Sequence, residues 1–224
     1  MAGATANTVR LGRRPCLQWW VLNAALACGG LGVTSASAGS QLEEPLSESV
    51  RTALTAAIAL AAPPEPVLRS AAEQQAYGQW LASCSAILAR WLPHTAERQE
   101  FLQTLWYEAR RAGLSLSLVL GLVQVESAFR KHAVSSVGAM GYMQVMPFWA
   151  RLIGDGDDTR LFHMQTNLRF GCVILRHYLD RERGDLFLAL GRYNGSRGKA
   201  PYPDAVLGAK RLWEFTAKSP SGPS

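Results

Sequence analysis

Apolar residues recur every three or four positions along most of this chain, and no stretch alternates as a half-buried strand would. That spacing places apolar side chains on one face of an α-helix. The pattern therefore predicts a mainly α fold. A short helix is expected from about residue 147, and the longer ones at 50–62, 70–91, 95–112, 116–129, 168–182, 186–193 and 203–215.

Capping and turn residues separate the predicted helices. Thr95 is a suitable N-cap, and Pro147 fits the first turn of a helix, where no backbone N–H is needed. Residues 131–142 are small and include glycines, which predicts a loop. Asn194-Gly195 is a turn dipeptide that ends the helix before it.

The helix patterns also predict which side chains are buried. The helix at 116–129 is apolar on almost every side, so we expect it in the core. In the helix at 168–182, the expected inner face carries Leu168, Cys172, Leu175 and Leu179, and the outer face Arg169, Arg176 and Asp180. In the last helix, the residues available for packing include Tyr202, Val206, Leu207 and Trp213.

Residues 1–38 are typical of a secretory signal peptide. A basic start with three arginines precedes a largely apolar run, and small residues at 36–38 suit signal peptidase. Polar and glycine residues interrupt the run, which disfavours a membrane-spanning helix. We therefore expect an exported protein, located in the bacterial periplasm.

Two other forms of export stay open. Residues 25–28 are similar to a lipoprotein cleavage site, which would leave Cys28 lipidated and associate the protein with the outer membrane. Arg13-Arg14 suggests twin-arginine export, although the residues that follow do not match the usual pattern.

The charge balance changes when the signal peptide is removed. The chain has 23 basic and 17 acidic residues, a net charge of +6. Loss of three arginines leaves 20 basic against 17 acidic residues, or +3. A mild positive charge suits an anionic polymer. No basic run or RNA-binding signature supports nucleic acid as a partner.

No metal site is predicted. Outside the signal peptide only Cys84 and Cys172 remain, and their spacing does not suit zinc. These two cysteines either form a disulfide or stay free and buried. The acidic segment 154–158 lacks the ligand spacing of an EF-hand, so a solvated turn is favoured there.

Glu126 is the strongest candidate for acid catalysis. It lies near the C-terminal end of the apolar helix, where burial and the negative end of the helix dipole favour a protonated carboxyl. Such a carboxyl can donate a proton to a leaving-group oxygen, as glycoside cleavage requires. The alternative is an ordinary helix end, with Glu126 paired to Arg130 four residues later.

Three motifs follow one another in the chain. They are Glu126-Ser127, the segment GAMGYMQVMP at 138–147, and Tyr193-Asn194. In this order and spacing they resemble the motifs of the family 1 lytic transglycosylases, which have an SLT-type, lysozyme-like domain.

The resemblance covers roughly residues 108–213 and implies a domain organisation. A lysozyme-like catalytic domain is expected at 96–217. A short N-terminal helical extension at 39–95 would precede it, and a flexible tail at 218–224 would follow.

The resemblance also implies a reaction. Glu126 would protonate the oxygen between MurNAc and GlcNAc, then deprotonate the MurNAc 6-hydroxyl, forming 1,6-anhydro-MurNAc with neither water nor a cofactor. Peptidoglycan glycan strands would be the partner. The implied substrate contacts are Ser127, Ser135, Gln144, Met146, Tyr193 and Asn194.

Several motif residues also have a purely structural interpretation. Methionines can fill core gaps, and loop or turn residues can serve only their own turns. This alternative applies to Ser135, Met143, Met146, Tyr193 and Asn194. Gln144 differs, because its amide needs a partner if it is buried.

Three residues depart from the family pattern. Tyr142 stands where leucine is common, Arg192 replaces a small or apolar residue, and Ser196 follows the turn glycine. These changes affect the expected sugar contacts rather than the acid. Arg192 is expected either to face solvent or to meet an anionic peptide stem.

A second carboxylate is missing from the motifs. Ordinary retaining glycosidases place one about 5 Å from the acid, and inverting ones about 6.5–9.5 Å. Outside the motifs, Asp155, Asp157, Asp158 and Asp185 lie in expected turns. One carboxylate suits the transglycosylase reaction, while a lysozyme-like hydrolase and a non-catalytic peptidoglycan-binding protein remain alternatives.

Overall fold

The computed structural model describes residues 41, 51–52, 55, 66–153 and 157–217. The expected signal peptide, Cys28 and the C-terminal tail lie outside these residues, as does most of the helix expected at 50–62. Those expectations therefore stay predictions.

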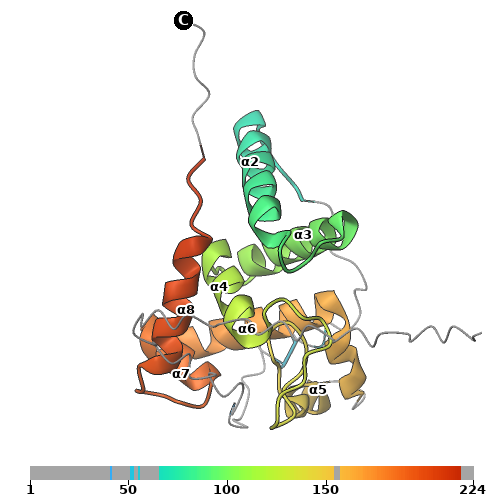
Figure 1. The fold of residues 1–224 in the computed structure, drawn as a ribbon. Coiled ribbons are helices and arrows are strands. Elements are labelled where there is room, and N and C mark those ends of the chain that lie inside the picture. Colours follow the sequence, from blue (N-terminus) through green and yellow to red (C-terminus); the bar gives the residue numbers. More distant parts are fainter. Residues whose placement is uncertain (1–40, 42–50, 53–54, 56–65, 154–156, 218–224) are drawn as a thin grey trace, which may run out of the picture. The chain divides into compact units, whose positions relative to one another are not determined.

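Helices dominate the described residues, so the mainly α prediction is confirmed (Figure 1). Within the described part of the chain, extended backbone pairs only in isolated bridges, which join Val134 to Met140 and Met140 to Val145. The elements are α2 (Ala71–Leu88), α3 (Thr95–Arg111), α4 (Leu116–Ser127), α5 (Pro147–Ile153), the 3-10 helix η1 (Asp158–Phe162), α6 (Met164–Arg181), α7 (Leu186–Tyr193) and α8 (Pro201–Leu212).

Helix boundaries differ from the predictions by a few residues. Thr95 is the first residue of α3 rather than its N-cap, which is His94. α4 ends at Ser127, because Ala128 and Phe129 take left-handed backbone angles, with φ of 48° and 60°. Such angles cannot continue a right-handed helix. α6 and α8 each begin earlier than predicted.

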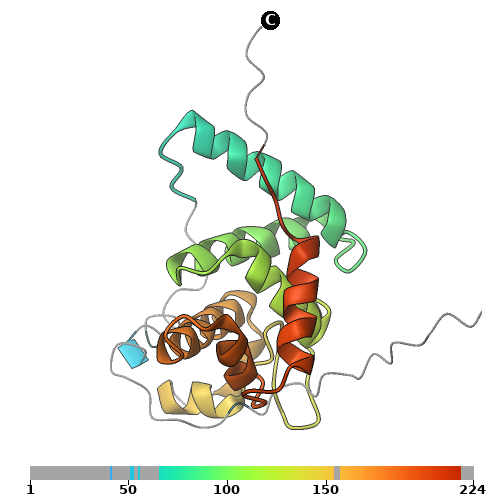
Figure 2. The ribbon, with the colours of Figure 1, turned by 90° about the vertical axis from the view of Figure 1, so that its left-hand side faces the viewer.

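α4 lies in the centre of the core, as its apolar sequence predicts. Its residues from Leu118 to Val123 are buried. Figures 1 and 2 both place α4 beside α8, and Gly121 marks the closest approach. A Cβ atom at Gly121 would lie 2.6 Å from the backbone nitrogen of Lys210. The two helices therefore cross at a distance that only glycine allows.

The prediction for Arg169 is wrong, because this residue is buried rather than outside. Its Nε donates to Glu108 Oε1 at 2.8 Å, and both side chains are 1% exposed. Arg169 lies three residues before Cys172, at the margin of the inner face of α6. A carboxylate on α3 makes burial of the guanidinium possible, and the sequence pattern of α6 contains no sign of that partner.

α2 belongs to the same core as the helices that follow it. Trp80, Cys84 and Leu88 are buried in the cluster that also contains α3 and α4 residues. Figure 2 shows α2 against α3. This packing favours a brace for the motif-bearing helices, while the domain boundary at residue 95 stays a prediction.

Cys84 and Cys172 are both free and buried, so no disulfide joins them. Burial raises the pKa of the Cys84 thiol to about 12. Of the two alternatives for these cysteines, a disulfide or free buried thiols, the structure shows the second, and buried thiols of this kind are unreactive. Within the described part of the chain, none of the helices combines the length and apolar character needed to cross a bilayer.

Candidate active site

Glu126 lies in the last turn of α4, and its side chain is inside the protein. Its side chain is buried, with 7% of its surface exposed. Oε1 accepts a hydrogen bond of 2.5 Å from the hydroxyl of Tyr202, and Oε2 has no hydrogen-bond partner among the residues that the structure describes. One carboxyl oxygen is therefore held in place, and the other is left for a further partner.

The surroundings of Glu126 favour its protonated form. Burial raises the pKa of the carboxyl to about 8, although the hydrogen bond from Tyr202 acts in the opposite direction. The carboxyl is therefore mostly protonated at neutral pH. The alternative pairing with Arg130 is wrong, because the Arg130 Nε donates to the Ser127 carbonyl at 3.0 Å instead.

Tyr202 is the site residue that the sequence assigned only to packing. It lies in the first turn of α8, directly after Pro201, and is 3% exposed. Burial and the neighbouring Glu126 raise the pKa of its phenol well above the usual value, so it remains a proton donor in hydrogen bonds. A tyrosine at the start of a helix gives no local sign that its hydroxyl meets a carboxyl 76 residues away.

Gln144 organises the loop between α4 and α5. Its backbone has a left-handed φ of 48°, and its buried side-chain amide donates to the carbonyls of Ala133 and Gly141 at 3.1 and 3.0 Å. The expectation that a buried amide here needs partners is confirmed. Met146, two residues further on, is only partly buried.

Three side chains fasten this loop to the surrounding helices through backbone groups. The Ser127 hydroxyl donates to the Tyr142 carbonyl at 2.8 Å, and the Tyr193 hydroxyl donates to the Met143 carbonyl at 2.7 Å. Asn167 accepts from the Met143 N–H at 2.8 Å and donates to two other carbonyls. In this structure Ser127 and Tyr193 shape the loop, which is a different task from the predicted substrate contact.

Asn167 is a second residue whose role the sequence did not reveal. It is 1% exposed on α6, and all three of its hydrogen bonds reach residues outside that helix. A Cβ atom at Gly141 would lie 2.3 Å from the Asn167 amide nitrogen. Glycine in the loop and asparagine on the helix therefore fit together.

Ser135 and Asn194 lie in separate turns. Ser135 Oγ accepts from the Ala139 N–H at 3.0 Å, and Asn194 Nδ2 donates to Ser196 Oγ at 3.0 Å. The Asn194 Oδ1 atom is buried, and none of the described groups donates a hydrogen bond to it. The expected turn at Asn194 is confirmed, and its free oxygen remains a candidate for a substrate contact.

Arg192 is paired with a carboxylate of the same chain. Its Nε donates to Glu182 Oε1, which also accepts from Arg197 at 2.7 Å, and 22% of the Arg192 side chain is exposed. The side chain therefore meets solvent in part, and its contact with an anionic peptide stem stays a prediction. Among the described residues, no group of three or more His, Cys, Asp or Glu side chains is placed to hold a metal ion.

Comparison with known proteins relates part of this chain to a protein family. Residues 104–203, a little under half of the chain, match the profile of the transglycosylase SLT domain. The match includes Glu126, the Gln144 loop, Tyr193-Asn194 and also Tyr202.

The similar curated proteins are transglycosylases that are longer than the matched segment. A transglycosylase of Enterobacteria phage PRD1 is 36% identical over 115 residues, which are 48% of this chain and 42% of that protein. A membrane-bound lytic murein transglycosylase C of Histophilus somni is 34% identical over 121 residues, 47% of this chain and 33% of that protein. The chain thus spans less than half the length of these relatives.

A solved structure is also similar. It is an inactive variant of the lytic transglycosylase Slt from Pseudomonas aeruginosa, with a TM-score of 0.41 and 17% identity. The similarity covers 76% of this chain and 36% of that one.

Proposed function

We propose that this protein is a peptidoglycan lytic transglycosylase, a glycan lyase that cleaves the β-1,4 bond between MurNAc and GlcNAc. The observation that carries the proposal is Glu126, which lies buried at the end of α4 with a raised pKa and one oxygen held by Tyr202. The match of residues 104–203 to the transglycosylase SLT domain supports the same reaction.

In the first step, protonated Glu126 donates its proton to the glycosidic oxygen. The bond between that oxygen and the MurNAc anomeric carbon breaks, and the GlcNAc side leaves as an alcohol. Positive charge on the anomeric carbon is shared with the acetamido oxygen of the same sugar. The Tyr202 hydroxyl stabilises the new carboxylate, because a hydrogen bond favours the charged form of its acceptor.

In the second step, the Glu126 carboxylate takes the proton of the MurNAc 6-hydroxyl. The hydroxyl oxygen attacks the anomeric carbon and closes the 1,6-anhydro ring, which returns Glu126 to its protonated form. Among the described residues, no second carboxylate is hydrogen-bonded to Glu126 or to Tyr202. One carboxyl serves both steps because the nucleophile belongs to the substrate.

The remaining motif residues divide into supports and proposed contacts. Ser127, Gln144 and Tyr193 hold the loop by hydrogen bonds to backbone carbonyls. We assign the substrate contacts to Met146, which is partly exposed, and to Asn194, which has a free buried oxygen. Ser135 keeps its place in the loop through Ala139.

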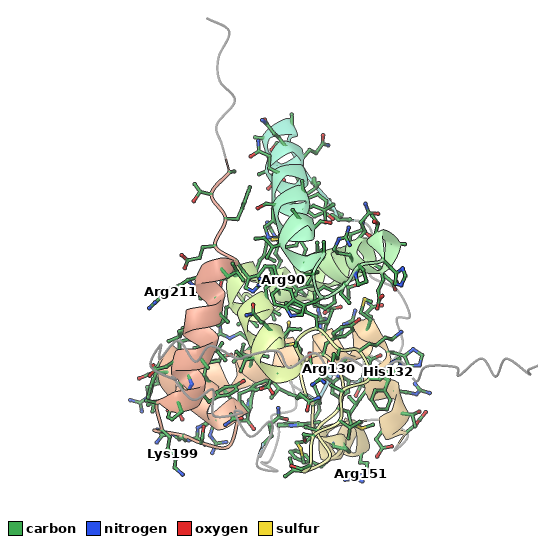
Figure 3. All side chains as sticks on the ribbon, viewed as in Figure 1. Arg90, Arg130, His132, Arg151, Lys199 and Arg211 are labelled. Atoms are coloured by element: carbon green, nitrogen blue, oxygen red, sulfur yellow. The ribbon has the colours of Figure 1, made fainter. Side chains whose placement is uncertain are left out.

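Two basic residues of the loop suit a substrate that carries carboxylates. Arg130 and His132 lie on the loop directly after α4, and Figure 3 labels them together with four further basic residues on other elements. None of the six is paired with a described carboxylate: Arg90, Arg130, His132, Arg151, Lys199 and Arg211. Peptidoglycan strands with anionic peptide stems match this charge.

The proposed location follows from the proposed substrate. Peptidoglycan lies outside the cytoplasmic membrane, and residues 1–38 have the features of an export signal. We therefore place the protein in the bacterial periplasm, with outer-membrane anchoring through Cys28 as the alternative.

Product analysis tests the proposal. Purified sacculi are digested with the wild type, Glu126→Gln and the matched surface variant Glu100→Gln, and the fragments are analysed by mass spectrometry. We expect 1,6-anhydro ends from the wild type and Glu100→Gln, and none from Glu126→Gln. Only hydrated reducing ends would identify a lysozyme-like hydrolase, and cleavage by Glu126→Gln would contradict the assignment of the acid.

A further inference from the structure

Gln41 lies against the loop that carries Gln144, although about a hundred residues separate them in the chain. Its side chain is 4% exposed. Oε1 accepts from the Trp149 indole N–H at 2.8 Å and from the Met146 backbone N–H at 3.4 Å. Nε2 donates to the Gln144 carbonyl at 3.5 Å. One carboxamide therefore meets two donors and an acceptor.

These contacts lie next to the acid. The Tyr193 hydroxyl donates to the Met143 carbonyl of the same loop at 2.7 Å. Burial raises the pKa of Tyr193 well above its usual value, Glu126 adds to the rise, and the Gln41 side chain acts in the opposite direction. Gln41 and Glu126 thus both lie close enough to Tyr193 to affect its pKa. Met146, the proposed substrate contact, supplies one of the donors that Gln41 occupies.

The three partners of Gln41 form an edge that recognises an amide. Two N–H groups require a carbonyl oxygen, and a carbonyl requires an N–H. The acetamido group of an N-acetylated sugar also carries a carbonyl oxygen, which can accept from the same two N–H groups as Gln41 Oε1, while its trans N–H points the other way. Gln41 and such a sugar therefore compete for the same hydrogen bonds.

We propose that the Gln41 carboxamide is a built-in competitor that occupies an amide-binding edge of the glycan site and is displaced by the acetamido group of the incoming strand. This inference rests on the proposed function for the identity of the ligand. The acetamido carbonyl takes the place of Gln41 Oε1 as the acceptor, so neither state leaves the buried Trp149 indole without an acceptor.

A competing Gln41 and a merely structural Gln41 differ in how their removal changes ligand binding. Without Gln41 and without ligand, the Trp149 N–H loses its partner, and the free protein becomes less stable. An N-acetylated ligand restores that partner. Gln41→Ala should therefore lower the melting temperature of the free protein and increase the rise in melting temperature that the ligand produces.

The test measures binding of a tetramer of N-acetylglucosamine. It uses the Glu126→Gln background, which prevents turnover, and compares Gln41→Ala with Gln75→Ala, a glutamine exposed on α2. Calorimetry gives the Kd, and the indole N–H resonance of Trp149 in nitrogen-15 spectra reports the edge. We expect about tenfold tighter binding for Gln41→Ala, which corresponds to an edge occupied by Gln41 for about 90% of the time.

The Gln75→Ala control should leave the affinity unchanged, and the ligand should shift the Trp149 resonance in both variants. Unchanged or weaker binding by Gln41→Ala overturns the proposal, and so does a Trp149 resonance that the ligand does not move. If the wild type releases anhydro ends from sacculi but Gln41→Ala does not bind the tetramer more tightly, the proposed function stands and the competitor role of Gln41 is overturned. If Gln41→Ala binds more tightly but the wild type gives no anhydro products, the competitor role stands and the proposed function is overturned.

Discussion

Replacement of Glu126 by glutamine should change how the stability of the protein depends on pH. The folded-state pKa of this carboxyl is about 8, against 4.5 for an unperturbed glutamate, because burial disfavours the charged form. Between these two values the folded protein binds the proton more tightly than the unfolded chain does. The stabilisation is complete below about pH 4.5 and is lost as the pH rises through 8.

The size of the effect follows from the shift. A difference of about 3.5 units between the two pKa values, at about 1.4 kcal/mol per unit, amounts to on the order of 5 kcal/mol. Wild type should lose this contribution to its free energy of unfolding across the interval. Glu126→Gln has no proton to lose and keeps the acceptor oxygen for Tyr202, so the variant should not show this loss.

Urea unfolding at intervals from pH 5 to pH 9 measures the difference. The free energy of unfolding of the wild type should fall relative to that of Glu126→Gln as the pH rises. Glu100→Gln, at an exposed position on α3, controls for the loss of a charge. Curves for the wild type and Glu126→Gln that stay parallel over the whole range would refute a protonated, buried Glu126.

Three other changes test the contacts around the site. Tyr202→Phe removes the hydrogen bond that lowers the pKa of Glu126, so the alkaline limit of activity should move to higher pH. The value of kcat should also fall about 10- to 100-fold, and an unchanged pH profile would contradict this role of Tyr202. Gly121→Ala brings a Cβ atom within 2.6 Å of the Lys210 nitrogen and should destabilise the protein by about 1–3 kcal/mol in urea unfolding. Gly208 has open space around it, so Gly208→Ala should not destabilise the protein, and equal effects of the two variants would argue against a tight helix crossing. Arg169→Met removes the buried cation of Glu108 and leaves only the half-exposed Arg111, whose Nε lies 3.3 Å from Glu108 Oε2, so stability should fall by about 3 kcal/mol. Replacing Glu108 by leucine as well should restore part of this loss, and no recovery in the double variant would contradict the pairing.

Local features of the sequence predicted the helices because helix formation depends on residues three or four positions apart. The apolar run of α4, the proline at the start of α5 and the turn after Tyr193 are signals of this kind. They led to the mainly α fold and placed Glu126 at the end of a buried helix. The order of three motifs then indicated the reaction, through resemblance to a family.

Long-range pairs were beyond the reach of those local patterns. Tyr202 was expected only to pack, and Arg169 was expected outside, because the partner of each lies on a different helix. Asn167 and Gln41 act through backbone groups of a loop far away in the chain. Whether such a polar side chain is buried depends on a partner that the folded chain brings to it.

The sequence by itself therefore determined the helices of the described residues to within a few positions, and it singled out Glu126 as the carboxyl proposed to do the chemistry. Only the tertiary structure decided the state of that carboxyl, because its pKa depends on burial by neighbouring helices and on a hydroxyl that α8 brings to it. The tertiary structure also placed Gln41 at the edge of the site. Both results depend on which groups become neighbours in space, which periodicity along one helix cannot reveal.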